Sequence, residues 1–129
     1  MSNSGRRTIL VVDDENDLIN IIKITLERYG YFVHDFSDPV LALRHIKEDR
    51  CNECKIALCD IKMPVMTGLE LAVHLKRIRP DLIILLMSAM PIDKEKWRKV
   101  LPKSENVDDF IPKPFTMADL IRAVKKWQE

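Results

Sequence analysis

Short apolar runs alternate with amphipathic segments along almost the whole chain. Five segments have the pattern of strands: Thr8–Val12, Tyr31–Phe36, Lys55–Cys59, Leu82–Met87 and Val107–Ile111. Thr8–Val12 is continuously apolar, as expected for a strand that is buried on both faces of a sheet. Leu82–Met87 is the most apolar segment, which favours a central position, whereas Tyr31–Phe36 alternates and is expected near an edge.

Apolar residues recur at helical spacing between these runs. Helices are predicted over Asn16–Tyr29, Asp38–Lys47, Gly68–Arg79, Pro91–Leu101 and from Thr116 to the end of the chain. Gly30 is a stop signal for the first helix. Asp38 is an N-cap followed by a proline at the first helical position, and Thr116 caps the last helix.

Strands that alternate with helices indicate a parallel sheet with helices on both faces. Five such units favour an α/β, flavodoxin-like, doubly wound five-stranded parallel sheet with strand order 2-1-3-4-5 and five helices. The chain has 129 residues, which suits one domain. We expect residues 1–7 to form a flexible N-terminal tail and residues 8–129 to form the domain.

Composition and charge exclude several classes of protein. The chain is 47% hydrophobic and 32% charged with a net charge of +1, which is typical of a soluble globular domain without long disorder. The near-zero charge predicts no direct nucleic-acid binding. No apolar run reaches membrane-spanning length, and residues 1–7 lack an apolar signal core, so a cytoplasmic location without a membrane partner is predicted.

The three cysteines give a weak signal. Cys51 and Cys54 have the C-x-x-C spacing of metal or redox sites, but there is no second pair to complete a zinc site. An incidental pair between a helix and a strand is the favoured interpretation, and a redox or metal role stays open. Cys59 lies in an apolar strand and is expected to act as a small buried hydrophobic residue.

Three carboxylates follow two of the predicted strands. Asp13 and Asp14 come directly after Ile9–Val12, and Asp60 ends the run Ile56–Cys59. In the order 2-1-3-4-5 these strands are neighbours, so the carboxylates converge at the carboxyl edge of the sheet, where open α/β sheets bind their ligands. Like charges this close need a cation, and carboxylate oxygens suit Mg²⁺.

Two further strand ends bring a hydroxyl and an ammonium to the same edge. The fourth strand is followed by Ser88 and the fifth by Lys113. Together with a cation, these groups suit a phosphoryl group whose oxygens carry negative charge. A carboxylate can itself attack phosphorus and form an aspartyl-phosphate.

The chain resembles the receiver domain of two-component response regulators of the chemotaxis-regulator type. The motifs that carry the resemblance are Val11-Val12-Asp13-Asp14-Glu15, Asp60-Ile61-Lys62-Met63-Pro64 with Met66 and Gly68, Ser88-Ala89, and Lys113-Pro114-Phe115. They occur in the family's order and cover residues 8 to about 127. Each motif alone has an ordinary structural explanation, but four of them in register on five βα units are a specific signal.

The resemblance implies a role for each of these residues. Asp60 is then the phosphoacceptor, and Asp13, Asp14, Asp60 and the backbone carbonyl of Lys62 hold Mg²⁺.

Ser88 and Lys113 contact the phosphoryl oxygens and share the catalytic work with Asp60, the Lys113–Pro114 bond is cis, and Ser88 and Phe110 form the switch. Phe110 stands where a tyrosine is more frequent, so the switch would move an apolar ring inward. The segment between Ser88 and Lys113 is longer than in most of the family and lacks its usual Gly-Ala pair.

The implied function is that of a signalling switch rather than a metabolic enzyme. A sensor histidine kinase or phosphotransfer protein would donate the phosphoryl group, and a downstream effector protein or effector domain would read the changed surface. The domain would catalyse at most slow self-phosphorylation and autodephosphorylation, and phosphorylation could drive homodimerisation. The chain is either a stand-alone regulator or a receiver from a longer protein.

Three other functions fit the sequence less well than that of a receiver domain. A receiver-like docking module that does not take phosphate is disfavoured because all five site residues are present. A haloacid-dehalogenase-type phosphatase places its nucleophile after the first strand in a D-x-D pattern, whereas Asp13-Asp14-Glu15 stands there. A flavodoxin-like FMN carrier needs a phosphate loop at the same position, and these acidic residues would repel the phosphate. The histidines His34, His45 and His74 are predicted to lie away from the site.

Overall fold

The computed structural model describes residues 7–48, 54–89, 95 and 106–128. Within them, five parallel strands form one sheet in the order β2-β1-β3-β4-β5, which confirms the predicted order. The strands are β1 (Thr8–Val12), β2 (Phe32–Phe36), β3 (Cys54–Asp60), β4 (Ile83–Ser88) and β5 (Asp109–Pro112). The helices are α1 (Asn16–Arg28), α2 (Pro39–Lys47), α3 (Gly68–Ile78) and α5 (Met117–Trp127).

Four of the five predicted helices are therefore present in the described residues. The remaining one, Pro91–Leu101, lies outside them apart from residue 95. The strand that begins at Ile83 is interior, between β3 and β5, but the middle position of the sheet belongs to β3. The edge position of β2 is as predicted from its alternating sequence.

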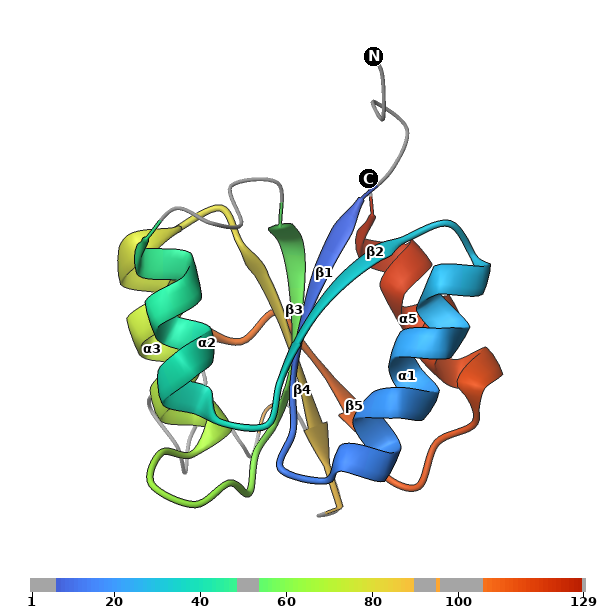
Figure 1. Ribbon diagram of the computed structural model, residues 1–129, viewed down its shortest axis with the longest axis horizontal. Coiled ribbons are helices and arrows are strands. Elements are labelled where there is room, and N and C mark those ends of the chain that lie inside the picture. Colours follow the sequence, from blue (N-terminus) through green and yellow to red (C-terminus); the bar gives the residue numbers. More distant parts are fainter. Residues whose placement is uncertain (1–6, 49–53, 90–94, 96–105, 129) are drawn as a thin grey trace.

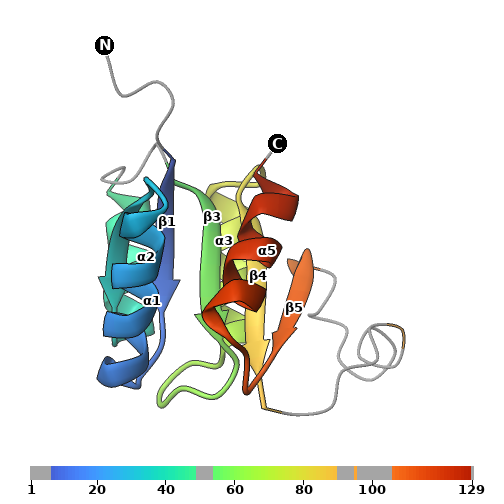
Figure 2. The same ribbon diagram turned by 90° about the vertical axis from the view of Figure 1, so that its right-hand side faces the viewer.

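Two layers of helices cover the sheet. Helices α2 and α3 lie on one face, and α1 and α5 lie on the other (Figures 1 and 2). Side chains of β1 alternate between the two layers: Leu10 and Val12 belong to the cluster under α2 and α3, whereas Ile9 and Val11 belong to the cluster under α1 and α5. This double burial is the physical reason why β1 is apolar at every position.

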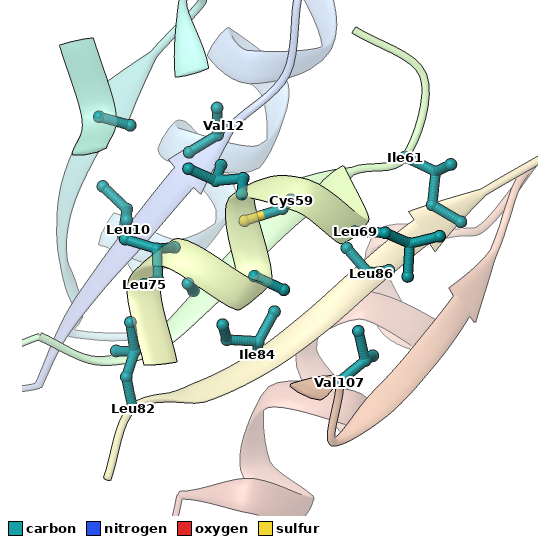
Figure 3. Close-up of a cluster of buried hydrophobic side chains, with 14 of the residues drawn as sticks. Leu10, Val12, Cys59, Ile61, Leu69, Leu75, Leu82, Ile84, Leu86 and Val107 are labelled. Atoms are coloured by element: carbon teal, nitrogen blue, oxygen red, sulfur yellow. The ribbon is translucent and has the colours of Figure 1, made fainter. Parts of the chain in front are cut away.

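The cluster under α2 and α3 reaches the carboxyl end of the sheet. Figure 3 shows Leu10 of β1 beside Leu75 of α3, and Leu86 of β4 beside Leu69 at the start of the same helix. Burial raises the pKa of the Cys59 thiol to about 12, so this cysteine is an inert core residue, as predicted. Cys54 is also buried, while Cys51 lies outside the described residues.

The predicted helix signals have their expected geometry. Gly30 has a φ of +92°, and the amides of Gly30 and Tyr31 donate to the carbonyls of Glu27 and Leu26, which forms a Schellman end to α1. The Asp38 carboxylate accepts a hydrogen bond of 2.8 Å from the Val40 amide at the start of α2. Thr116 caps α5 in the same way by accepting from the Asp119 amide at 3.0 Å.

Strand β5 begins at Asp109, two residues later than the sequence predicts. The pairing is mixed at Asp108: its amide donates to the Ile84 carbonyl at 2.8 Å, but the Ile84 amide donates to the Asp108 carboxylate, also at 2.8 Å, instead of to a backbone carbonyl. Val107 is nevertheless buried, which explains its apolar character. Among the described residues, no helix has the length and apolar character needed to cross a membrane.

Candidate functional site

Four strands end at the same edge of the sheet and carry the predicted site residues. Val12 pairs with Cys59, and Asp60 pairs with Met87, so the end of β1 adjoins the end of β3. Ser88 pairs with Pro112, and the Lys113 amide donates to the Ser88 carbonyl at 2.6 Å. The parallel register therefore brings Asp13, Asp60, Ser88 and Lys113 to one edge.

An acidic cluster forms the centre of this edge. One carboxylate oxygen from each of Asp13, Asp14 and Asp60 lies within 4.8 Å of the others. Asp13 has no exposed surface and Asp60 is 6% exposed, whereas Asp14 lies at the surface. The Asp13 side chain is oriented by the Glu15 amide, which donates to its Oδ1 at 2.9 Å.

Lys113 supplies the positive charge that faces the cluster. Its Nζ lies 3.2 Å from Asp13 Oδ2 and 3.3 Å from Asp60 Oδ1. A third carboxylate, that of Glu15, is 3.6 Å away and largely exposed. One ammonium thus bridges two buried carboxylates, which leaves the cluster with excess negative charge. The peptide bond between Lys113 and Pro114 is cis.

The ionisation of these groups reflects burial and crowding. Burial raises the pKa of Asp60, and the neighbouring Asp13 raises it further, against the opposing effect of Lys113. Burial likewise raises the pKa of Asp13, partly offset by its backbone hydrogen bond and by Lys113. For Lys113, burial acts to lower the pKa, but the attraction of Asp13 and Asp60 outweighs it, so the net shift is upward.

The donor set fits a hard divalent cation. Carboxylate oxygens are the ligands that Mg²⁺ and Ca²⁺ prefer, and a cation would favour the ionised form of the two aspartates, whose pKa values are raised mainly by burial. Among the described residues, Asp13, Asp14 and Asp60 form the only group of three or more side chains suited to hold a metal.

A cleft opens beside the cluster. Its volume is about 570 Å³, and its lining comprises Asp14, Glu15, Asp60, Ile61, Lys62, Ser88, Ala89 and Lys113. Asp60 thus faces a space large enough for a phosphoryl group, with hydroxyl and ammonium groups on its walls. His34, His45 and His74 do not line the cleft, as predicted.

The loop from β3 to α3 is held tightly against Asp60. The Gly68 amide donates to the Ile61 carbonyl at 2.9 Å, and a Cβ at Gly68 would lie 2.3 Å from the Asp60 carbonyl oxygen. Gly68 therefore allows the first turn of α3 to approach the end of β3. Val65 has a φ of +74° and an exposed fraction of 89%, and a β-branched residue in this conformation is strained.

Ser88 and Phe110, the predicted switch residues, are both buried. Ser88 is 2% exposed at the end of β4, and Phe110 is 7% exposed and belongs to the cluster under α2 and α3. The ring already occupies an inner position in this structure, so the expected inward turn has little distance left to cover.

Sequence reasoning missed two features of the site. The first is the Glu15 carboxylate, which stands in the quoted motif but was not expected to face Lys113. The second is the backbone conformation of Val65, for which a valine gives no sequence signal, because residues with positive φ are normally glycine or asparagine.

Comparison with known proteins agrees with this site. A family model described as the response regulator receiver domain matches residues 9–125. The response regulator GtcR of Aneurinibacillus migulanus is 31% identical over 92% of this chain and 46% of its own length. The receiver protein CpdR of Brucella abortus is 30% identical over 93% of this chain and 95% of its own. The chain thus spans about half of GtcR and nearly all of CpdR.

Solved structures share the fold. The response regulator TrrA of Thermotoga maritima, crystallised in complex with Mg²⁺ and beryllofluoride, superposes with a TM-score of 0.79 at 29% identity, covering 94% of this chain and 98% of TrrA. The family match spans the sheet and all four strand ends that form the cleft. The chain belongs to the response regulator receiver domain family and is the receiver domain of a two-component response regulator.

Proposed function

We propose that Asp60 accepts a phosphoryl group from the phosphohistidine of a sensor histidine kinase or phosphotransfer protein in a Mg²⁺-dependent reaction. The observation that carries this proposal is the position of the Asp60 carboxylate. It lies 3.3 Å from the Lys113 ammonium, in a group with Asp13 and Asp14, and it lines an open cleft. Of the three aspartates, Asp13 has no exposed surface to offer a donor.

The transfer exchanges one bond to phosphorus for another. A carboxylate oxygen of Asp60 forms the O–P bond as the N–P bond of the donor breaks, and the released imidazole takes up a proton. The reaction needs Asp60 ionised, whereas burial raises its pKa. Lys113 favours the ionised form and stands where it can pair with a phosphoryl oxygen.

The acidic cluster supports Mg²⁺ as the cofactor. Asp13, Asp14, Asp60 and the Lys62 carbonyl would hold the ion, and Lys62 lines the same cleft. The ion would neutralise charge on the carboxylates and on the transferring group. The beryllofluoride and Mg²⁺ complex of TrrA, a related fold, supports the same arrangement in this chain.

The output of the proposed reaction is a changed surface. Ser88 lines the cleft at the end of β4, so its hydroxyl can bond a phosphoryl oxygen, and Phe110 lies on the neighbouring strand β5. A change at Ser88 would be passed to Phe110 and to the face near β5 and α5. A downstream effector protein or effector domain would read that face, and a phosphorylation-dependent homodimer is one form the output can take.

The domain acts on this proposal as a switch with slow chemistry of its own. It would take phosphate from small donors slowly and hydrolyse its own phosphoaspartate slowly. The cytoplasmic location and the division into a tail at residues 1–7 and a domain at 8–129 remain predictions of the sequence.

Intact-mass spectrometry after incubation with acetyl phosphate and Mg²⁺ tests the proposal. The wild type should gain one phosphoryl mass, and Asp60→Asn should gain none. Asp81→Asn is the matched control, because Asp81 is an exposed aspartate at the opposite end of the sheet and should label normally. Undiminished labelling of Asp60→Asn would move the acceptor to another residue, and an unlabelled wild type would favour a docking module that does not take phosphate.

A further inference from the structure

Two histidines face each other away from the acidic cleft. His34 lies on the edge strand β2 and His45 lies on α2, the helix that packs against this part of the sheet (Figure 1). His34 Nδ1 is 2.8 Å from His45 Nε2, and both side chains are half-buried. The Phe36 ring stacks against His45 with a centroid separation of 5.1 Å, so one side of the pair is apolar.

The separation of the two nitrogens matches that of neighbouring ligands on a metal ion. Two nitrogens that are each about 2.0 Å from an ion and subtend a right angle are about 2.8 Å apart. Tetrahedral coordination would separate them by about 3.3 Å at the same bond length. The observed 2.8 Å is the hydrogen-bonded separation of the metal-free pair, and it already equals the separation required by square-planar or octahedral coordination, which Ni²⁺ and Cu²⁺ prefer.

The tautomers decide whether the pair can act as a chelate. Without an ion, one of the two facing nitrogens donates a proton to the other, because two bare lone pairs at this distance would repel. An ion that replaces this proton requires His34 to carry its hydrogen on Nε2 and His45 to carry its hydrogen on Nδ1. In this exchange the hydrogen moves from the facing nitrogen of one ring to the other nitrogen of the same ring, so both imidazoles stay neutral and no net proton is released.

We propose that His34 and His45 form a bidentate site for a divalent transition metal of the Ni²⁺ or Cu²⁺ class. The site would join α2 to the edge strand β2. Over the residues that the structure describes, His34 and His45 do not belong to a group of three or more metal-binding side chains, so the proposed site has two ligands from these residues. Bound metal would stabilise the fold, and the stabilisation would grow with the logarithm of the free metal concentration above Kd, since the pair is assembled only in the folded chain.

The site is separate from the phosphoryl cleft in both position and chemistry. None of the cleft-lining residues belongs to β2 or α2. Imidazole nitrogens suit Ni²⁺ and Cu²⁺, whereas the aspartate oxygens suit Mg²⁺. An excess of Mg²⁺ should therefore occupy the acidic cluster without displacing Ni²⁺ from the histidines.

Isothermal titration of untagged protein with Ni²⁺, in the presence of excess Mg²⁺, tests the proposal. His34→Ala and His45→Ala should each weaken the affinity by about tenfold or more, because each removes one of two protein ligands. His74→Ala is the matched control, since His74 is an exposed histidine on α3, and its affinity should stay within about twofold of wild type. Asp60→Asn should likewise leave Ni²⁺ binding unchanged.

Two further measurements keep the result interpretable. His34→Gln and His45→Gln preserve side-chain bulk and hydrogen bonding while removing an imidazole, so they distinguish ligand loss from unfolding, which circular dichroism would detect. The electron paramagnetic resonance spectrum of the Cu²⁺-loaded protein should show two nitrogen ligands. The proposal would be overturned if the wild type and the single histidine variants bound Ni²⁺ with equal affinity. It would also be overturned if the wild type bound Ni²⁺ no more tightly than a variant that carries both His34→Gln and His45→Gln.

Discussion

The two ends of the sheet treat polar groups in opposite ways. At the amino end, polar groups meet complementary partners: Arg79 Nη2 donates to the Cys54 carbonyl at 2.7 Å, and the Tyr31 hydroxyl donates to the Gln128 side chain. At the carboxyl end, Asp13 and Asp60 are buried side by side with a single ammonium between them.

Further pairs at the amino end follow the same rule. Asp108 accepts from Lys76 at 3.0 Å and from the Ile84 amide at 2.8 Å. Asp109 accepts from the Trp127 indole nitrogen at 3.0 Å, which holds the end of α5 to the start of β5. Each of these carboxylates is matched by a donor and stabilises the fold.

Stabilising polar pairs and the candidate functional site thus lie at opposite ends of the sheet. Complementary pairs at the amino end lower the free energy of the folded state, whereas crowded like charges at the carboxyl end raise it. A bound cation would offset this repulsion. Substitutions should therefore have opposite effects at the two ends, and the following predictions test that contrast in order of expected size.

The largest effect is expected from Gly68→Ala. A Cβ at Gly68 would collide with the Asp60 carbonyl oxygen, so the end of β3 or the start of α3 must move, at a cost of about 3 kcal/mol in unfolding free energy. Gly30→Ala, at the amino end, meets no atom within 4 Å. It should cost about 1 kcal/mol, from its positive φ alone. Urea unfolding of both variants provides the comparison, and equal losses would refute the close-approach argument.

Lys113→Ala should have the next largest effect. Its removal leaves Asp13 and Asp60 buried without their shared cation, which should lower the unfolding free energy by about 2 kcal/mol in metal-free protein. Lys76→Ala removes the cation beside Asp108, whose carboxylate is 27% exposed and keeps the Ile84 amide as a donor, so it should cost about 0.5 kcal/mol. The Lys113 loss should shrink in an Asp60→Asn background, and strict additivity in that double-mutant cycle would argue against a direct attraction.

Asp60→Asn and Asp108→Asn should change stability in opposite directions. Asp60→Asn removes a buried like charge beside Asp13 and should stabilise the metal-free protein by about 1 kcal/mol. Asp108→Asn weakens two complementary contacts and should destabilise it by about 1 kcal/mol. Thermal or urea unfolding without Mg²⁺ measures both, and a destabilising Asp60→Asn would contradict the contrast between the two ends.

The stability of the folded protein should also depend on pH through the buried carboxylates at the carboxyl end. The carboxyl pKa values of Asp13 and Asp60 are raised in the folded protein above their ordinary value, mainly by burial. The folded state then holds these protons more tightly, so their contribution is present below the unfolded pKa and is lost as pH rises through the folded pKa. Lys113, whose pKa is also raised, keeps its contribution until strongly alkaline pH.

The contribution of this cluster to the stability of the metal-free protein should therefore fall as the pH rises above about 4, the ordinary aspartate pKa, and through the raised folded pKa. Asp60→Asn should flatten the slope relative to wild type, and Mg²⁺ should reduce it, because the ion favours the ionised carboxylates. Parallel stability–pH curves for wild type and Asp60→Asn would show that the cluster does not set the slope.

Asp14→Ala should have the smallest effect on stability. Asp14 is exposed, and its charge raises the pKa of Asp60 less than burial and Asp13 do. Removing it should therefore stabilise the metal-free protein by about 0.5 kcal/mol or less. The same substitution should weaken Mg²⁺ binding, which a fluorescence or calorimetric titration can follow. A clearly destabilised Asp14→Ala would indicate that the exposed carboxylate has a structural partner.

The strand order and the edge of the sheet at which the site residues meet could both be predicted from the sequence. Doubly buried strands must be apolar throughout, and parallel strands need crossover helices, so the pattern of Thr8–Val12 and its counterparts predicts both the layers and the strand order. Helix ends at Gly30, Asp38 and Thr116 were predictable for the same kind of local reason, because caps depend on a few adjacent residues.

The distances within the site could not be predicted from the sequence and are known only from the tertiary structure. The bridge from Lys113 to Asp13, the approach of Gly68 to Asp60 and the late start of β5 at Asp109 all depend on contacts between residues on different elements. The contact between His34 and His45 belongs to the same class. Local patterns record which side chains face the core, but the separation of two side chains on different elements depends on how those elements pack.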